Sequence, residues 1–571
     1  MKTHLDWVAH ASRVPAIASS QSRTLVLTSF SSLRLSVEKG RFGETPNQHA
    51  RRVRYPDSPS PYCHKVDMSY LDLLKLAAPE AIVTLTALVV LAIGLTTSRG
   101  TAVAGVSIAK PQNAAGTAAP TAFCALVAVL GLIVAIGAAL VLPQNAMLFR
   151  GMLVISPLNS LFQIVCLILA LFTILLASRE TPNYGEYLAI VLLAAIGLLL
   201  LVSSEELLMI FIGLELTGLS LYLMTAFDKT DIRSAEAGLK YFLFGSTASA
   251  FTLFGLSFIY GMAGTTSLAD IAANLAGQSL SPLLFAGMVM TLVGFAFKIA
   301  AAPFHLWAPD AYQGAPVSSA AFIASGSKVA SFVVLGKIVL IGFGPVHGSA
   351  DWHAMIAGWS PVLAVLAAFS ILIGNLVALV QTNLRRLLAY SAVAHAGYTL
   401  LGIIAGGREG FSATLFYTTI YAFTLIGAFG VVALVRRETG GDELQNFAGL
   451  RARSPLLAGC MAVFMLSLAG LPPLAGFFGK FYLFSAAFRA GPNHGLLWLV
   501  ALALFGSLIS LYYYLIVLKV IFQTQGAEAR SLSPFAQNRL SRLTIVFAAA
   551  IVLSLGITPQ FLVARILAAL P

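Results

Sequence analysis

The stretch GFAFKIAAAPFHLWAPD (294–310) places a lysine, a proline and a histidine inside an otherwise apolar segment. A proline inside a helix removes a backbone hydrogen bond, and a membrane protein tolerates such a break where it lines a cavity. A second stretch, AGLPPLAGFFGK (469–480), breaks at Pro472, 169 residues after Pro303. The two breaks lie five predicted spans apart. Because five is an odd number, the second unit would be inverted in the membrane relative to the first. Paired broken helices in inverted repeats are typical of ion-translocating membrane proteins.

The composition of the whole chain requires a lipid environment. Of 571 residues, 58% are hydrophobic and only 10% are charged, whereas soluble proteins carry about 25% charged residues. No CxxC motif or Cys/His cluster is present, so neither a disulfide scaffold nor a protein-held metal or iron–sulfur cofactor is expected. No basic, aromatic-interleaved patch indicates a nucleic-acid partner.

Segments that are long and apolar enough to cross a bilayer recur along the chain. A spanning helix needs about 20 mostly apolar residues, whereas the strands of a membrane barrel alternate over about ten. We therefore predict an all-α polytopic membrane protein. The fourteen predicted spans are 72–97, 121–142, 158–178, 184–203, 206–226, 236–262, 282–302, 317–343, 360–381, 384–404, 411–436, 453–489, 495–522 and 542–567.

Basic residues are distributed unevenly between the two sets of loops. Fourteen Lys and Arg residues lie in loops that follow odd-numbered spans, and only Arg150, Arg408 and Arg489 lie in the opposite loops. Because basic loops stay on the cytoplasmic side, both termini are predicted to be periplasmic.

Residues 1–67 are expected to stand apart from the membrane domain. They are rich in Ser and Arg and lack the apolar core of a secretory signal. They are interpreted as a disordered tail or as an extension upstream of a true start at Met68, with an organelle transit peptide as the alternative. The transmembrane domain is predicted over 68–571, with repeats at about 184–343 and 360–522.

Several charged residues lie inside the predicted spans rather than at their ends. A charge at the centre of a membrane helix costs at least about 2.5–3.5 kcal/mol, so such residues usually pair or line an ion path. A buried lysine with a movable acidic partner can load and release a proton near neutral pH, whereas arginine stays charged. The residues are Glu215, Lys240, Lys298, Lys328, Lys337 and Lys480.

Simpler explanations exist for some of these residues. Lys240 and Lys337 could extend to the membrane interface, and Glu215 could pair with a neighbouring helix for packing alone. Histidine can relay protons near neutrality, and this role is assigned to His305 ahead of His395. Lys337 and His395 are therefore secondary candidates.

Five segments together resemble a known family. They are GLELTGLSLYLMTAF (213–227), EAGLKYFLFGSTASAF (236–251), FKIAAAPFHLWAPDAYQGAP (297–316), NLRRLLAYSAVAHAGY (383–398) and LAGLPPLAGFFGKFYLF (468–484). They are similar to the antiporter-like subunit N of bacterial complex I, the equivalent of mitochondrial subunit 2. The stretch PDAYQGAP (309–316) resembles subunit N rather than subunits L and M or the Mrp-type antiporters. The family often has a second proline after this stretch, where Val317 and Ser318 stand here.

The resemblance implies a proton-translocating subunit of NADH:quinone oxidoreductase in a bacterial inner membrane. It implies fourteen helices, with inverted five-helix repeats at helices 4–8 and 9–13. NADH, FMN, iron–sulfur clusters and quinone would belong to other subunits, and no cofactor would bind this chain. Subunits M and K of the membrane arm would be its partners.

The resemblance also implies how proton transport would be coupled. Glu215 and Lys240 would form a coupling pair, and Lys298 would be the central lysine that is loaded with a proton. Opening the pair would expose Lys298 to the positive charge of Lys240, and like charges lower each other's proton affinity.

The remaining residues would carry the proton onward. By their match to the family motifs, His305 and Lys328 would continue the internal path, and Lys480 would be the exit-side lysine.

Other functions share some of these features. An Mrp-type cation/proton antiporter would have the same buried lysines, and sodium-dependent transport would favour it. A non-pumping scaffold subunit would hold its charges for packing alone. A solute carrier is a weaker alternative, because no polar pocket of substrate size is evident.

Overall fold

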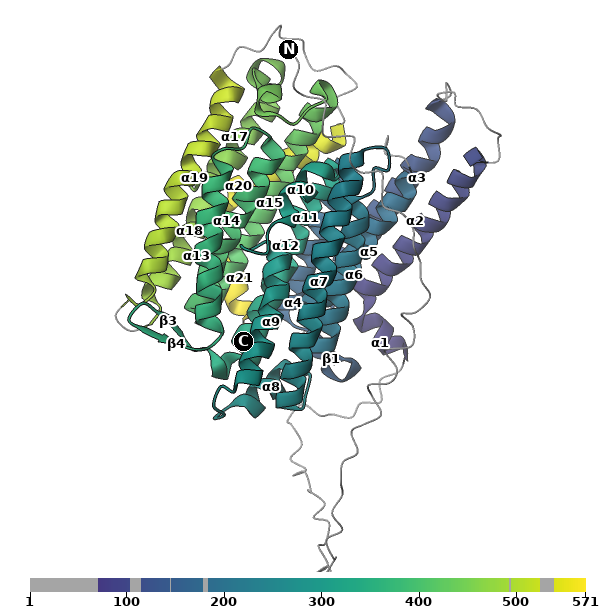
Figure 1. Cartoon of the computed structure of the whole chain (residues 1–571). Helices are drawn as coiled ribbons and strands as arrows, with labels where there is room; N and C mark the ends of the chain where they lie inside the picture. The colour runs from purple at the N-terminus through teal and green to yellow at the C-terminus, as the bar shows by residue number, and fades with distance from the viewer. Residues whose placement is uncertain are drawn as a thin grey trace, which may run out of the picture. The chain divides into compact units, whose positions relative to one another are not determined.

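The computed structural model describes residues 70–102, 114–143, 145–177, 183–491, 494–523 and 539–570. All of them belong to the unit Met68–Pro571, and Figure 1 shows this unit as a bundle of long helices. The predicted extension at 1–67 lies outside the described residues.

The elements follow one another as helices with a few short connecting structures. The first half contains α1 (Tyr70–Leu76), α2 (Ala78–Ala102), α3 (Ala114–Val141), β1 (Ala146–Leu148), β2 (Leu153–Ile155), α4 (Pro157–Leu176), α5 (Tyr184–Ser203), α6 (Leu207–Thr225), α7 (Ile232–Ala263), α8 (Leu268–Leu275), α9 (Pro282–Ile299), α10 (Trp307–Gly314), α11 (Val317–Ala324) and α12 (Gly326–Lys337). The second half contains β3 (Ser349–Asp351), β4 (Ala354–Ile356), α13 (Trp359–Ala378), α14 (Leu384–Ala405), α15 (Gly407–Thr439), α16 (Leu450–Arg453), α17 (Pro455–Ala469), α18 (Ala475–Arg489), α19 (Leu497–Gln523), α20 (Arg539–Ile557) and α21 (Gln560–Ala569).

The predicted all-α polytopic class is confirmed. Thirteen helices among the described residues are long and apolar enough to cross a membrane. Strands β1 and β2, and strands β3 and β4, form two antiparallel hairpins in connecting segments. The chain is therefore a multi-pass membrane protein.

The predicted span 453–489 is not one continuous helix. It consists of α17 and α18, each of 15 residues, and neither is long enough to cross a bilayer alone. Gly470 ends α17 in the left-handed region, with φ of 83°, and Pro472 and Pro473 follow it. A glycine that can adopt this conformation and two prolines that cannot continue a helix explain the break.

The break in the seventh span begins earlier than predicted. Helix α9 ends at Ile299, three residues before the expected end at 302, because Ala300 has a left-handed φ of 58°. The opened backbone is satisfied by side chains from other elements. The Ala302 N–H donates a 2.8 Å hydrogen bond to Ser370 Oγ of α13, and Trp307 Nε1 of α10 donates a 3.0 Å bond to the carbonyl of Phe297. The gap is thus built into the fold.

The eighth span, predicted as one helix over 317–343, is divided into three parts. Helix α11 ends at Ala324, Ser325 departs from helical geometry with φ of −111° and ψ of −77°, and α12 follows. A π-helical turn, Ile338–Gly342, completes the span. Such turns are frequent at functional sites, and this span carries both Lys328 and Lys337.

Helix α15 forms the centre of the bundle. Its 33 residues contact α11, α14, α17, α18 and α20, and the most apolar part of the helix is completely buried. Helices α2 and α3 pack on each other and on α5 at one edge of the bundle (Figure 1). Helix α7 also faces outward, with Leu243 and Phe254 exposed. The bundle therefore offers a lipid-free interior around α15.

Candidate functional site

Lys298 lies at the end of α9, against α6. It is buried, and its Nζ donates a 3.4 Å hydrogen bond to the carbonyl of Leu214. The same Nζ lies 5.6 Å from the centre of the Tyr222 ring, within the range of a cation–π interaction. Glu215 acts on Lys298 electrostatically, and it accepts a short hydrogen bond from Ser249 of α7. Lys298 is therefore a buried amine with a nearby carboxylate that it does not contact.

A glycine of α6 makes room for this lysine. A Cβ atom built on Gly218 would lie 2.6 Å from Lys298 Nζ and 3.3 Å from the hydroxyl of Tyr222. Any side chain larger than glycine would therefore move the amine. The motif GLELTG (213–218) thus supplies both the carboxylate and the space beside it.

The structure does not bring Glu215 and Lys240 together, although we predicted that they form a pair. Lys240 Nζ lies 2.6 Å from the carboxylate of Glu236 and 2.9 Å from that of Asp310. Glu215 accepts a hydrogen bond from Ser249, which lies nine residues after Lys240 in α7. At 1.5 Å per residue this is about 13 Å along the helix axis, which is beyond the reach of a lysine side chain.

Asp310 joins the two predicted repeats. Besides Lys240 of α7, its carboxylate binds Arg386 of α14, whose Nη1 lies 2.7 Å from Asp310 Oδ1. Arg386 Nη1 also donates a 3.1 Å hydrogen bond to Gln313. The cluster is only partly shielded, because the Lys240 and Asp310 side chains are 42% and 29% exposed.

Three further candidate residues form a continuous buried group around α14 and α15. Lys328 Nζ donates a 2.7 Å hydrogen bond to the carbonyl of Ala392 and lies 5.3 Å from the centre of the Tyr421 ring. The Tyr421 ring centre is in turn 5.1 Å from that of His395. Both Lys328 and Lys480 act electrostatically on His395. His395 therefore lies between two buried lysines.

Tyrosines surround His395 and extend the group to Lys480. His395 Nδ1 is hydrogen-bonded to the hydroxyl of Tyr417, and Nε2 lies 3.0 Å from the hydroxyl of Tyr514. Its ring centre lies 5.5 Å from that of Tyr398, and Lys480 Nζ lies 5.2 Å from the Tyr398 ring centre. Aromatic side chains thus separate the three basic groups at short, regular intervals.

Lys480 stands at the outer end of this group. Its buried amine donates hydrogen bonds of 3.1 Å to the Ala469 carbonyl, at the end of α17, and of 2.9 Å to Ser507 Oγ of α19. The residue also lines an open cavity of about 520 Å³ between α18 and α19, and Ser485 and Arg489 belong to the same cavity wall. Lys480 is therefore a buried base next to open space.

His305 lies in the opened backbone segment of the seventh span. It is buried in the break between α9 and α10, with its ring edge-on to Tyr390 at 6.2 Å. Its Nδ1 has no hydrogen-bond partner among the described residues. No hydrogen bond or ring contact among the described residues joins it to Lys298 or Lys328, so its role stays a prediction.

Lys337 belongs to a separate polar network. Its buried amine donates hydrogen bonds of 2.7 Å to Asn159 Oδ1 and 2.9 Å to the Val202 carbonyl, and it lies 3.4 Å from Glu205. These contacts tie α12 to α4 and α5. The possibility that Lys337 extends to the interface is therefore not realised here.

Some of these polar groups were not identified from the sequence. Asp310 lies in the recognised stretch 309–316, but its two cationic partners come from distant helices. Gln163 of α4 donates hydrogen bonds of 2.7 Å to Glu80 of α2 and 2.6 Å to Ser203. The only signal for Glu80 was an acidic residue at the start of the first long span. Tyr421 looked like an ordinary aromatic residue in an apolar helix.

Comparison with known proteins identifies the family. The sequence model of the NADH:quinone oxidoreductase/Mrp antiporter transmembrane family matches residues 204–510, which is more than half of the chain. NADH-quinone oxidoreductase subunit N 2 from Acidobacterium capsulatum is 46% identical over 508 residues, covering 87% of this chain and 98% of the relative. The chain belongs to the subunit N family. Subunit N from Desulforamulus reducens is 40% identical over 437 residues, covering 76% of this chain and 88% of its own.

Solved structures agree with this assignment. A chain of respiratory complex I from Thermus thermophilus has a TM-score of 0.67 and 32% identity, covering 85% of this chain and 98% of that one. A chain of the Mrp complex from Dietzia sp. DQ12-45-1b shares the fold, with a TM-score of 0.70 at 21% identity. The predicted subunit N resemblance is thus confirmed. Its relatives are subunits of an enzyme complex, and this member of the subunit N family is part of a multi-subunit membrane complex.

The expectation that no cofactor binds this chain stays a prediction. Within the described residues, no group of three or more His, Cys, Asp or Glu side chains could hold a metal ion. The buried and partly buried titratable groups described above include amines, imidazoles, phenols and carboxylates, and such groups can take part in acid–base chemistry.

Proposed function

We propose that this chain moves protons across a bacterial inner membrane as part of a proton-translocating NADH–quinone oxidoreductase. Transport would be driven by quinone reduction in other subunits, with subunits M and K as neighbours in the membrane arm. The observation that carries the proposal is the buried group Lys328–His395–Lys480, joined by Tyr421 and Tyr398. Ionisable residues inside a membrane are expensive to bury, and they usually mark proton pathways.

The proton would be loaded on Lys298 and passed to Lys328. Buried polar atoms near this step, such as the hydroxyls of Thr217 and Tyr222 and Nδ1 of His305, have no partner among the described residues. Buried polar groups of this kind are usually satisfied by ordered water. We infer that water connects Lys298 to Lys328, with His305 beside the connection.

From Lys328 the proton would pass to His395 and then to Lys480. The Lys480 cavity, which reaches Arg489 at the end of α18, would release it. By the distribution of basic loops, this end of the protein would face the periplasm, as would both termini.

Coupling would act through Glu215. Its carboxylate, which accepts a hydrogen bond from Ser249, acts electrostatically on Lys298. Lys240 is instead paired with Glu236 and Asp310. A movement of α6 against α9 that alters the Glu215–Lys298 distance would change the proton affinity of Lys298. One unit of pKa corresponds to 1.36 kcal/mol, so a small movement in a low-dielectric site is sufficient.

The decisive experiment replaces the central lysine in the assembled complex. Lys298→Ala should abolish coupled proton transport in proteoliposomes, measured by a pH-sensitive dye while quinone reduction is followed in parallel. Lys298→Arg should fail as well, because a guanidinium does not release its proton. Normal proton transport by either variant would refute the proposal.

The same preparation separates the alternatives. A cation/proton antiporter would show sodium-dependent proton movement without quinone reduction. A scaffold subunit would allow Glu215→Gln and Lys298→Met complexes to assemble and pump like the wild type.

A further inference from the structure

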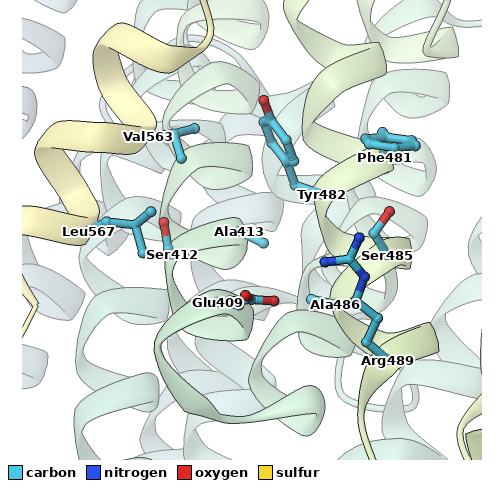
Figure 2. A pocket seen from close by; sticks show the side chains of 10 residues that line it. All are labelled: Glu409, Ser412, Ala413, Phe481, Tyr482, Ser485, Ala486, Arg489, Val563 and Leu567. Carbon is cyan, nitrogen blue, oxygen red and sulfur yellow. The ribbon is translucent and has the colours of Figure 1, made fainter.

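A second cavity lies beside the Lys480 cavity, at the end of the molecule where α15 begins and α18 ends. It has a volume of about 260 Å³ and is lined by residues of α15, α18 and α21. Figure 2 shows Glu409 of α15 and Arg489 of α18 with their charged groups turned toward the same space, and Val563 and Leu567 on α21. One end of the cavity is therefore charged and its walls are apolar.

Several polar groups of this cavity have no partner among the described residues. Neither Glu409 nor Arg489 takes part in an ion pair with another described residue. Ser412, which also lines the cavity, is only 3% exposed, and its hydroxyl has no hydrogen-bond partner in the described part of the chain. A buried hydroxyl without a partner costs about 1–3 kcal/mol, so the cavity is suited to a ligand that can satisfy it.

The wall formed by α21 is held in place by a neighbouring side chain. Arg408 donates 2.9 Å hydrogen bonds to the carbonyls of Leu567 and Leu570 at the end of α21. These bonds fasten the last turn of α21 to the start of α15. The cavity is thus a built feature of the fold rather than a loose gap between helices.

We propose that this cavity binds the headgroup of a zwitterionic phospholipid with a primary ammonium group, such as phosphatidylethanolamine. Arg489 binds the phosphate through charge-assisted hydrogen bonds, and Glu409 binds the ammonium. The hydroxyls of Ser412 and Ser485 donate to the phosphate or ester oxygens. The acyl chains leave along Phe481 and α21.

The two opposite charges decide the lipid class. An anionic headgroup such as phosphatidylglycerol would satisfy Arg489 but would bring its phosphate close to the Glu409 carboxylate, where like charges repel. A zwitterionic headgroup places one charge against each residue. The volume of about 260 Å³ is slightly below the usual range for small-molecule pockets, about 300–1,000 Å³, and therefore suits a headgroup rather than a whole lipid.

The test uses the assembled complex in nanodiscs that contain equal amounts of phosphatidylethanolamine and phosphatidylglycerol. A trace of photoactivatable phosphatidylethanolamine is cross-linked, and mass spectrometry maps the label on this chain. We expect labelling around 481–489 and on α21. Arg489→Gln should lower it about tenfold or more, the loss expected for a charge-assisted hydrogen bond.

Two further variants make the test specific. Glu409→Gln should change the preference toward a photoactivatable phosphatidylglycerol, because the remaining charge at the site is cationic. Lys519→Gln, at an exposed lysine in a different surface cavity, should leave the labelling at 481–489 unchanged.

Two outcomes would overturn the proposal. One is labelling at 481–489 that is the same in Arg489→Gln and Glu409→Gln as in the wild type. The other is proton transport that falls in Arg489→Gln while the lipid labelling stays unchanged, which would make the cavity an aqueous channel mouth. A wild-type complex that is not labelled at 481–489 but transports protons normally would also contradict the lipid proposal. The proposed function in proton transport would be unaffected by that result.

Discussion

Lys328 donates a 2.7 Å hydrogen bond from Nζ to the carbonyl of Ala392, so an amine of α12 is fixed to the backbone of α14 less than one turn before His395. The lysine has a carbonyl and the Tyr421 ring as its contacts, and it is fully buried. This environment can hold the amine either protonated or neutral, because neither contact is an ion pair. Removal of Lys328, the proposed proton carrier, should therefore not unfold the protein.

Lys328→Met should therefore separate transport from assembly. We expect normal assembly of the complex, since methionine fills a similar volume, and loss of most coupled proton transport. Dye quenching in inverted membrane vesicles, with the amount of assembled complex measured by native gel, checks both. Unchanged proton transport at equal assembly would remove Lys328 from the path.

Lys337→Met should instead impair the assembly and stability of the complex. The change leaves the buried Asn159 oxygen and the Val202 carbonyl without a donor, at a cost of about 1–3 kcal/mol for each unsatisfied group. We expect less assembled complex and a lower temperature of thermal inactivation. If the variant assembled fully and lost transport, Lys337 would be a carrier instead of a structural residue.

His395→Gln should slow proton transfer between Lys328 and Lys480. Glutamine can still accept and donate hydrogen bonds to Tyr417 and Tyr514, but it cannot take up a proton near neutral pH. We expect transfer slower by about 100-fold, the lower limit for loss of a positioned acid–base group. Single-turnover proton release measured with a surface pH probe would detect it. Tyr417→Phe, which keeps the imidazole, is the control and should retain most of the rate.

Gly218→Ala should displace the Lys298 amine without disturbing the fold. The new Cβ would lie 2.6 Å from Nζ, and the end of a lysine side chain can move aside. We expect normal assembly with transport reduced several-fold. The matched control is Gly261→Ala in α7, where no atom lies within 4 Å of the added Cβ; equal losses in both variants would contradict the prediction.

Asp310→Asn should weaken the connection between the two predicted repeats. Lys240 would keep Glu236, and Arg386 would keep Gln313, but the shared carboxylate would be lost. Because the cluster is partly exposed, we expect a destabilisation of about 1 kcal/mol, measured as a lower temperature of thermal inactivation. Glu236→Gln removes a partner of Lys240 alone, and it should have the smaller effect.

The span windows could be predicted because apolar runs of sufficient length leave a chain few alternatives in a bilayer. The breaks were located by Pro303 and Pro472, but their boundaries were not, since Ala300 and Gly470 end the helices through left-handed backbone conformations. The lysines and histidines were found because charged and titratable residues are rare in apolar helices.

The partners of those residues could not be predicted. Lys240 binds Asp310 because α10 packs against α7, and sequence spacing does not contain that information. We predicted the relay role for His305 ahead of His395. The structure places His395 between two lysines, because α14, α15 and α19 converge there. Tyr421 and Tyr398 carry no signal at all until their neighbours are known.

The positions of Tyr421 and Tyr398 also bear on proton leak through the chain when the complex is idle. Each ring lies between two basic groups, and an aromatic face, unlike a file of water, cannot conduct hydronium. We expect these rings to prevent protons from leaking back along this route when the complex is idle. The membrane potential would then be maintained between turnovers.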